Sequence, residues 1–291
     1  MTDPLIPICP AADPNVRPPA FKMPALACDT HAHVFGPPRR YAYTANRTYT
    51  PPDALLDQYL ALHNTLGIER GVLVQPSVYG TDNQAMIDAL TQLEGRYRGV
   101  AVVEPDIDLA ELERLHRAGV RGVRVNLLFK GGISYSDVET IAEKIKHLGW
   151  HIQVLIDVSE FENLYERLST LPVDVVIDHM GHMSTAKGLD HPGFQALLKL
   201  LETGRCWVKL SGAYRVTGQT QTPYSDVLSM AEVLIHTAPE RMVWGSDWPH
   251  PFVHIPMPND GALLDMLADW APDPALREQI LVHNPARLYD F

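Results

Sequence analysis

The sequence predicts a single (β/α)8 barrel, because eight short runs rich in β-branched residues alternate with helical patterns along 291 residues. This length suits one large α/β barrel, and a hydrophobic content of 46% is enough for a buried core. No Gly-x-Gly-x-x-Gly motif follows a predicted strand, so the eightfold count favours a barrel over an open doubly wound sheet. We expect strands over residues 27–34, 71–75, 99–104, 122–127, 151–156, 173–179, 206–210 and 241–247.

Helical periodicity fills the intervals between these strands. We place the barrel in residues 25–291 and treat residues 1–24, which are rich in proline, as a leader. The leader is expected to pack across the barrel or against a partner subunit, so a homo-oligomer is one expectation. Helices are expected over residues 52–66, 83–93, 109–118, 136–148, 161–171, 192–201, 225–237 and 261–270.

Composition excludes several classes of protein. No apolar run reaches the roughly 18 residues that a membrane span needs, and the N-terminus lacks a signal-peptide pattern. The net charge of −11 opposes binding to nucleic acid. The three cysteines are scattered and odd in number, which is typical of reduced thiols. We therefore expect a cytoplasmic protein whose partner is a small molecule.

Histidine and aspartate residues follow three of the predicted strands. His31 and His33 lie two residues apart, so an extended strand points both imidazoles to one face. His179 ends the sixth strand and Asp247 ends the eighth. By itself, the histidine pair is equally compatible with structural histidines, and an aspartate after a strand is often a helix cap. Together at the carboxyl ends of barrel strands, the four residues predict a catalytic site.

These motifs resemble the amidohydrolase superfamily. The resemblance rests on Asp29–Pro37, on the Asp-His-Met-Gly sequence at 178–181 and on Trp-Gly-Ser-Asp-Trp-Pro-His at 244–250. It extends from about Asp29 to Tyr289. The motifs are most specific for the branch related to 2-pyrone-4,6-dicarboxylate lactonase and 4-sulfomuconolactone hydrolase. The resemblance implies hydrolysis of a lactone, with Asp247 as the general base. His31, His33 and His179 would hold the carbonyl oxygen, directly or through a metal.

The same four residues, His31, His33, His179 and Asp247, are a credible ligand set for one Zn²⁺. Members of the resembled branch work either with zinc or without metal, so both remain open, with one zinc preferred. Two-metal sites elsewhere in the superfamily use a bridging residue on strand four and a histidine ending strand five. Here strand four offers Arg124 and Asn126, and no histidine ends strand five. A two-metal site is therefore not expected.

Cationic and hydroxyl side chains after the strands are candidates for substrate binding. Arg124 lies within strand four, where an inward arginine needs an anionic partner that a substrate could supply. For Arg47 and Lys130, an ordinary solvated surface charge is the equal alternative. The full set of expected substrate-binding residues is Arg124, Arg215, Ser77, Tyr49, Arg47 and Lys130.

Two departures from the resembled branch bear on the substrate. The pyrone dicarboxylate lactonases carry an arginine and a tyrosine near the ends of strands four and five. This chain offers Lys130 at the first position and Leu155-Ile156-Asp157 at the second. A lysine lacks the planar two-point grip of an arginine. We therefore expect an anionic lactone such as 4-sulfomuconolactone or a muconolactone relative rather than the pyrone dicarboxylate.

Two other functions compete with lactone hydrolysis. One is a metal-dependent decarboxylase of the same superfamily, and the other is a barrel that binds an acidic metabolite without turning it over. The presence of a carboxylate base favours an enzyme over a binder. We assign a lower weight to loop histidines such as His182, His250 and His254, and expect Lys209 to be buried beside a carboxylate.

Overall fold

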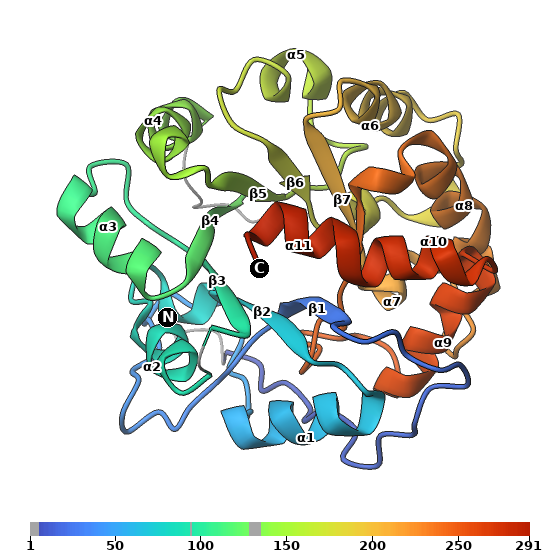
Figure 1. Ribbon diagram of the computed structural model, residues 1–291, viewed down its shortest axis with the longest axis horizontal. Coiled ribbons are helices and arrows are strands. Elements are labelled where there is room, and N and C mark those ends of the chain that lie inside the picture. The colour runs from blue at the N-terminus through green and yellow to red at the C-terminus, as the bar shows by residue number, and fades with distance from the viewer. Residues whose placement is uncertain (1–5, 94, 128–134) are drawn as a thin grey trace, which may run out of the picture.

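Eight parallel strands form one sheet in the order of the sequence (Figure 1). A computed structural model describes residues 6–93, 95–127 and 135–291. Every neighbouring pair from β1–β2 to β7–β8 is parallel, as the sequence predicted for a barrel. The strands are β1 (Cys28–Ala32), β2 (Arg70–Val74), β3 (Tyr97–Ala101), β4 (Val120–Asn126), β5 (His151–Leu155), β6 (Val175–Ile177), β7 (Cys206–Leu210) and β8 (Met242–Trp244).

The barrel closes between β1 and the segment that follows β8. The amide of Asp247 donates to the carbonyl of His31 at 2.7 Å, and the amide of His33 donates to the carbonyl of Trp248 at 2.8 Å. Ala32 also forms a parallel bridge with Trp248. These contacts join the first strand to the last, which confirms the predicted (β/α)8 barrel.

The α-helices surround the barrel (Figure 1). In the described part of the chain, no helix combines the length and the apolar character that a membrane crossing requires. The α-helices are α1 (Leu56–Leu66), α2 (Gln84–Thr91), α3 (Leu109–Arg117), α4 (Tyr135–Ile145), α5 (Leu164–Leu168), α6 (Pro192–Glu202), α7 (Ala213–Val216), α8 (Leu228–Thr237), α9 (Asp260–Trp270), α10 (Pro274–Glu278) and α11 (Asn284–Tyr289). Single turns of 3-10 helix are η1 (Ser77–Tyr79), η2 (Lys146–Leu148), η3 (His179–Gly181), η4 (Thr185–Lys187), η5 (Ser225–Val227) and η6 (Pro239–Arg241), and η7 (Gln279–His283) is a π-helix.

The helices after α9 were missing from the sequence-based expectation. Both carry a proline in their first turn, Pro274 in α10 and Pro285 in α11. Proline ends a helix in its interior but is tolerated in the first turn, where its missing N–H has no intrahelical partner to lose. Helix α5 is shorter than the predicted 161–171.

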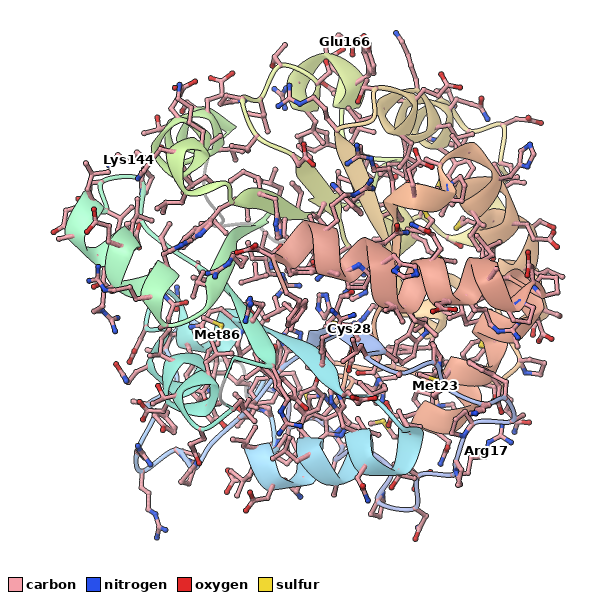
Figure 2. The ribbon with its side chains drawn as sticks, viewed as in Figure 1. Arg17, Met23, Cys28, Met86, Lys144 and Glu166 are labelled. Carbon is pink, nitrogen blue, oxygen red and sulfur yellow. The ribbon has the colours of Figure 1, made fainter. Side chains whose placement is uncertain are left out.

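The core has two layers that the sheet separates. The interior layer consists of Cys28, five valines, Trp207, Leu288 and Tyr289, and the larger layer lies between the sheet and its helices. Figure 1 shows α11 crossing the end of the barrel that faces the viewer, and Tyr289 of α11 belongs to the interior layer. Figure 2 places Cys28 in the middle of the molecule, whereas Lys144 and Glu166 lie at its edge. The opposite end, where the strands finish, is left for the site.

The leader runs over the outside of the barrel. Ile8 forms a bridge with Thr50, and the amide of Phe252 donates to Cys9 Sγ at 3.3 Å. Farther along, Arg17 pairs with Asp265 of α9 at 2.7 Å. These contacts fasten the leader to two loops beyond the strand ends and to α9.

Asp29 links β1 to the segment that follows β8, at the place where the barrel closes. Its Oδ1 accepts hydrogen bonds from the amides of His31 and Ser246 at 3.0 and 2.9 Å. Its Oδ2 accepts from the hydroxyls of Ser246 and Tyr59 at 2.5 and 3.1 Å. The carboxylate is fully buried, and His63 Nε2 lies 3.5 Å from it. One side chain thus joins β1, α1 and the segment after β8.

Replacing Asp29 with alanine should destabilise the whole barrel. Four buried donors lose their acceptor, and breaking a buried charge network costs about 3–5 kcal/mol. The measurement is the urea midpoint of unfolding. The control is Glu111→Ala, which removes the exposed pair with Arg114 and should cost less than about 1 kcal/mol. Equal midpoints for the two variants would contradict this role of Asp29.

Candidate active site

A pocket lies at the carboxyl ends of the strands, where barrel enzymes place their chemistry. It contains three of the four predicted catalytic residues, His33, His179 and Asp247, and His31 lies directly beside them. Its lining residues are His33, Tyr49, Ser77, Arg124, Asn126, Leu155, His179, His182, Arg215, Asp247, Pro251 and Phe252.

Asp247 presents two different oxygens to its surroundings. Its Oδ2 accepts from the Tyr214 hydroxyl at 2.6 Å and from Arg215 Nε at 2.7 Å. Its Oδ1 is buried without a hydrogen-bond partner among the described residues. Burial alone would raise the pKa of Asp247, but Arg215 and the nearby histidines hold it well below its usual range. The carboxylate is therefore ionised, with one oxygen occupied and one available.

Three imidazoles turn their Nε2 atoms toward Asp247. Those of His31 and His33 each lie 3.7 Å from Asp247 Oδ1, and that of His179 lies 3.8 Å from Oδ2. The rings of His31 and His33 are 5.0 Å apart between centroids, so the pair that the sequence singled out does face one place. Burial lowers the pKa of each of the three imidazoles.

The other ring nitrogen of each histidine is anchored. His33 Nδ1 lies 2.7 Å from the carbonyl oxygen of Val74, and His179 Nδ1 lies 2.9 Å from Ser211 Oγ. A carbonyl only accepts, so the hydrogen of neutral His33 is at Nδ1 and its Nε2 carries a lone pair. His33 can therefore bind a cation or accept a proton, but it cannot donate to an oxyanion.

Two buried charged side chains, Lys209 and Asp178, lie beside Nδ1 of His31. Lys209 Nζ donates to Gln153 Oε1 at 2.8 Å and to the carbonyl of Thr30 at 2.7 Å, and it lies 3.2 Å from His31 Nδ1. Lys209 also lies 3.8 Å from Asp178 Oδ1, which confirms the expected carboxylate neighbour. Burial lowers the pKa of Lys209 to about 8.

The predicted metal ligands fall into two overlapping groups. His31, His33 and Asp247 offer ligand atoms that lie within 4.8 Å of one another, and so do His31, Asp178 and His179. In the first group, His31 Nε2 and Asp247 Oδ1 are both buried without a hydrogen-bond partner among the described residues. Two imidazoles and a carboxylate fit Zn²⁺, which prefers such ligands. The structure thus separates His179 from the first group and adds Asp178 to the second.

Comparison with known proteins identifies the family. Residues 28–291 match the family model described as amidohydrolase. The chain belongs to the amidohydrolase family. It is 38% identical to a 4-sulfomuconolactone hydrolase of Hydrogenophaga intermedia over 97% of this chain and 95% of that protein. It is 41% identical to a 2-pyrone-4,6-dicarboxylate hydrolase of Comamonas testosteroni over 94% and 93%.

A solved structure agrees with this assignment. A probable 2-pyrone-4,6-dicarboxylic acid hydrolase from Acinetobacter baumannii, with citric acid bound, superposes with a TM-score of 0.82. The two chains are 30% identical, and the match covers 91% of this chain and 100% of the other. The amidohydrolase fold therefore extends over nearly the whole chain.

The expected substrate-binding residues divide by position in this amidohydrolase barrel. Ser77, Tyr49, Arg124 and Arg215 line the pocket. Arg47 does not line it, because its guanidinium donates to Thr50 Oγ1 and to the carbonyl of Thr44. Lys130 lies outside the described residues.

Arg124 and Arg215 already have carboxylate partners within the protein. Arg124 Nε lies 3.3 Å from Asp178 Oδ2, and Arg215 Nε lies 2.7 Å from Asp247 Oδ2. The partner that we expected an anionic substrate to supply for Arg124 is thus present within the protein, so the position of Arg124 does not by itself indicate an anionic substrate.

Several residues at the site were not assigned to it from the sequence. Asp178 directly precedes His179, which was the available signal, but its contact with His31 at 3.3 Å depends on the barrel geometry. Tyr214 directly precedes Arg215. His250, which received a lower weight because loop histidines are more often exposed, is fully buried and lies 3.1 Å from Asp260. Sequence patterns do not reveal such long-range pairs.

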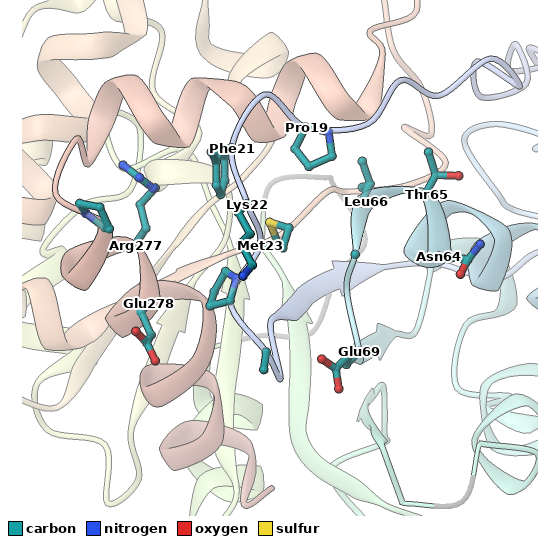
Figure 3. A pocket seen from close by; sticks show the side chains of 14 residues that line it. Pro19, Phe21, Lys22, Met23, Asn64, Thr65, Leu66, Glu69, Arg277 and Glu278 are labelled. Carbon is teal, nitrogen blue, oxygen red and sulfur yellow. The ribbon is translucent and has the colours of Figure 1, made fainter.

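A larger cavity, of about 760 Å³, lies elsewhere, between the leader, the end of α1 and α10 (Figure 3). Two of its charged groups, Glu69 and Arg277, have hydrogen-bond partners within the protein. Glu69 accepts from the amide of Leu26, and Arg277 donates to the carbonyls of Ala271 and Pro272. The cavity lies toward the start of β2, away from the strand ends where the histidines gather. Chemistry therefore belongs to the smaller pocket.

Removing the buried ammonium under His31 should destabilise the protein. Lys209→Met leaves Gln153 Oε1 and the carbonyl of Thr30 without their buried donor and removes the ammonium 3.8 Å from Asp178 Oδ1. Removal of one partner of a buried pair costs about 3–5 kcal/mol. Lys199→Met is the control, because Lys199 is exposed over the Tyr165 ring, where such a contact contributes about 1 kcal/mol or less. Urea unfolding compares the two. A loss at Lys209 no larger than that at Lys199 would contradict the network.

Proposed function

We propose that this amidohydrolase hydrolyses an anionic lactone, with Asp247 as the general base. The observation that carries the proposal is the asymmetry of Asp247: Oδ2 is held by Tyr214 and Arg215, and Oδ1 is left facing His31 and His33. The names of the relatives, hydrolases of sulfomuconolactone and pyrone dicarboxylate, support a lactone as the substrate class. A pocket built only for binding needs no such base, which disfavours a non-catalytic role.

In this mechanism Asp247 Oδ1 takes a proton from a water molecule, and the oxygen of that water bonds to the lactone carbonyl carbon. The carbonyl oxygen becomes an oxyanion in the tetrahedral intermediate. Its collapse breaks the bond between the acyl carbon and the ring oxygen. Asp247 then returns the proton to the departing alkoxide, which gives a hydroxy acid. Arg215 and Tyr214 hold Asp247 in place through Oδ2 during both transfers.

We further propose that His31, His33 and Asp247 hold one divalent cation, with zinc preferred. A carboxylate oxygen has two lone pairs, so Asp247 Oδ1 would contact the cation with one and take the proton of water with the other. The support is the lone pair at His33 Nε2, which cannot serve an oxyanion directly, together with the unpartnered Asp247 Oδ1. When bound, such a cation lowers the pKa of water and polarises a carbonyl. His179 lies outside this ligand group: its Nε2 is 3.8 Å from Asp247 Oδ2, and Ser211 contacts its Nδ1.

The charge around the pocket supports an anionic substrate. Three buried or nearly buried cations, Arg124, Lys209 and Arg215, stand against two buried carboxylates, Asp178 and Asp247. Arg124 contacts Asp178 through Nε while lining the pocket, and the described residues offer no hydrogen-bond partner to its other two nitrogens, which could bind a carboxylate or sulfonate.

The end of β5 bears on which lactone is bound. Leu155 lines the pocket at this position, where the sequence has no tyrosine. An apolar wall there favours 4-sulfomuconolactone or a muconolactone relative over the pyrone dicarboxylate.

The cysteines Cys9, Cys28 and Cys206 are all free and buried, which supports a reducing compartment such as the cytoplasm.

Asp247→Asn should abolish lactone hydrolysis, because an amide cannot take the proton of water. The expected fall in kcat is about 10²–10⁴-fold, the usual contribution of a general base. Initial rates are measured with 4-sulfomuconolactone, muconolactone and 2-pyrone-4,6-dicarboxylate. Asp88→Asn, at a carboxylate that binds Tyr41 away from the pocket, is the control and should keep normal rates.

Two results would overturn this assignment. Near-normal turnover by Asp247→Asn would remove Asp247 from the mechanism. Folded, zinc-loaded wild type that opens none of the three lactones would instead favour the decarboxylase alternative, which release of CO₂ from aromatic acids would test.

Zinc binding should depend on the first group of ligands. Protein stripped with a chelator is titrated with Zn²⁺ by calorimetry, and wild type should bind one equivalent. His33→Asn should weaken binding at least about 10-fold, because a ligand is lost. His182→Asn is the control, since His182 lines the pocket but belongs to neither ligand group. Equal affinity in both variants, or no binding by wild type, would contradict the proposed cation site.

A further inference from the structure

A buried line of polar side chains leads away from Asp247 toward α9. The Tyr214 hydroxyl donates to Asp247 Oδ2 at 2.6 Å, and His250 Nδ1 lies 3.2 Å from the same hydroxyl oxygen. His250 Nε2 lies 3.1 Å from Oδ1 of Asp260, the first residue of α9. His250 and Asp260 are fully buried, and Tyr214 is 5% exposed. No step of the mechanism above uses His250 or Asp260.

The donors and acceptors among these groups fix the direction of the hydrogen bonds between them. Tyr214 has a single hydroxyl hydrogen, and its short contact with a carboxylate assigns that hydrogen to Asp247. The oxygen of Tyr214 is then free to accept from His250 Nδ1. With a carboxylate beside Nε2 and a phenol oxygen beside Nδ1, both nitrogens of His250 face acceptors. Nδ1 therefore donates to the Tyr214 oxygen, and Nε2 makes a close polar contact, not a hydrogen bond, with Asp260 Oδ1.

The backbone holds His250 in this position. Its amide donates to the carbonyl of Asp247 at 2.7 Å, which closes a tight turn after β8. Asp247 and His250 both have positive φ, 63° and 59°. Non-glycine residues rarely adopt this conformation, and it persists where surrounding contacts enforce it. The contact with Asp260 is one such constraint.

We propose that Asp260 and His250 are positioning residues that act on Asp247 through Tyr214. Asp260 orients His250, His250 fixes the direction of the Tyr214 hydroxyl, and the hydroxyl holds Asp247 Oδ2. Oδ1 is thereby kept toward His31 and His33. Asp260 is not among the residues that line the pocket, so we expect its effect on the reaction to pass through this line.

A double-mutant cycle tests whether Asp260 acts on kcat through Tyr214. This measurement rests on the proposed lactone hydrolysis. Tyr214→Phe and Asp260→Asn should each lower kcat about 10-fold, the effect of losing a hydrogen bond to a charged group, with KM changed less than about twofold. The double variant should be no slower than Tyr214→Phe alone, because both changes break one line. Losses that multiply, or a folded Asp260→Asn with normal kcat, would overturn the proposal.

The control cycle uses Tyr41 and Asp88, a hydroxyl–carboxylate pair at 2.7 Å away from the pocket. Tyr41→Phe, Asp88→Asn and their combination should keep the wild-type kcat. If Asp260→Asn does not fold, His250→Gln takes its place in the same cycle, with the same two outcomes.

A second readout does not depend on activity. In proton NMR spectra, wild type should show a protected, strongly downfield imidazole N–H resonance that is lost in His250→Gln. This resonance should shift in Tyr214→Phe and in Asp260→Asn. A wild type with this resonance but no lactone turnover would refute the proposed function and leave the positioning line standing. Absence of the resonance from wild type would refute the line itself.

Discussion

The carboxylate of Asp29 is the constraint on which the site depends. A barrel of eight strands needs its first strand joined to its last, yet the regular part of β8 ends at Trp244, before the catalytic residues begin. Asp29 compensates by accepting hydrogen bonds from His31 and from Ser246, the residue before Asp247. The backbones that carry the general base and the first histidine are therefore tied to one buried group.

The buried charges beside the site are paired with one another. Isolated charges are costly to bury, and here cations and carboxylates alternate: Arg124 contacts Asp178, Asp178 neighbours Lys209, and Arg215 contacts Asp247. The histidines remain neutral among them because burial lowers their pKa. This arrangement keeps imidazole lone pairs and a carboxylate oxygen available in the pocket.

The sequence predicted the barrel because strand and helix periodicity is local, and it predicted the place of His31, His33, His179 and Asp247 because strand ends meet at one face. It failed where a role depends on contacts between distant residues. Arg124 looked unpaired until the fold brought Asp178 beside it, and His250 looked like a loop residue until α9 placed Asp260 against it. Arg47 follows β1 closely in sequence, yet its local hydrogen bonds keep it out of the pocket lining.

The central claim is that water adds to the lactone carbonyl carbon with Asp247 as the base. The most direct measurement is a single turnover in water enriched in ¹⁸O, followed by mass spectrometry of the fragmented product. Our account predicts one ¹⁸O atom in the new carboxylate and none in the new hydroxyl group, because the bond between acyl carbon and ring oxygen breaks. Label in the hydroxyl group would show cleavage on the other side of the ring oxygen and would contradict the mechanism.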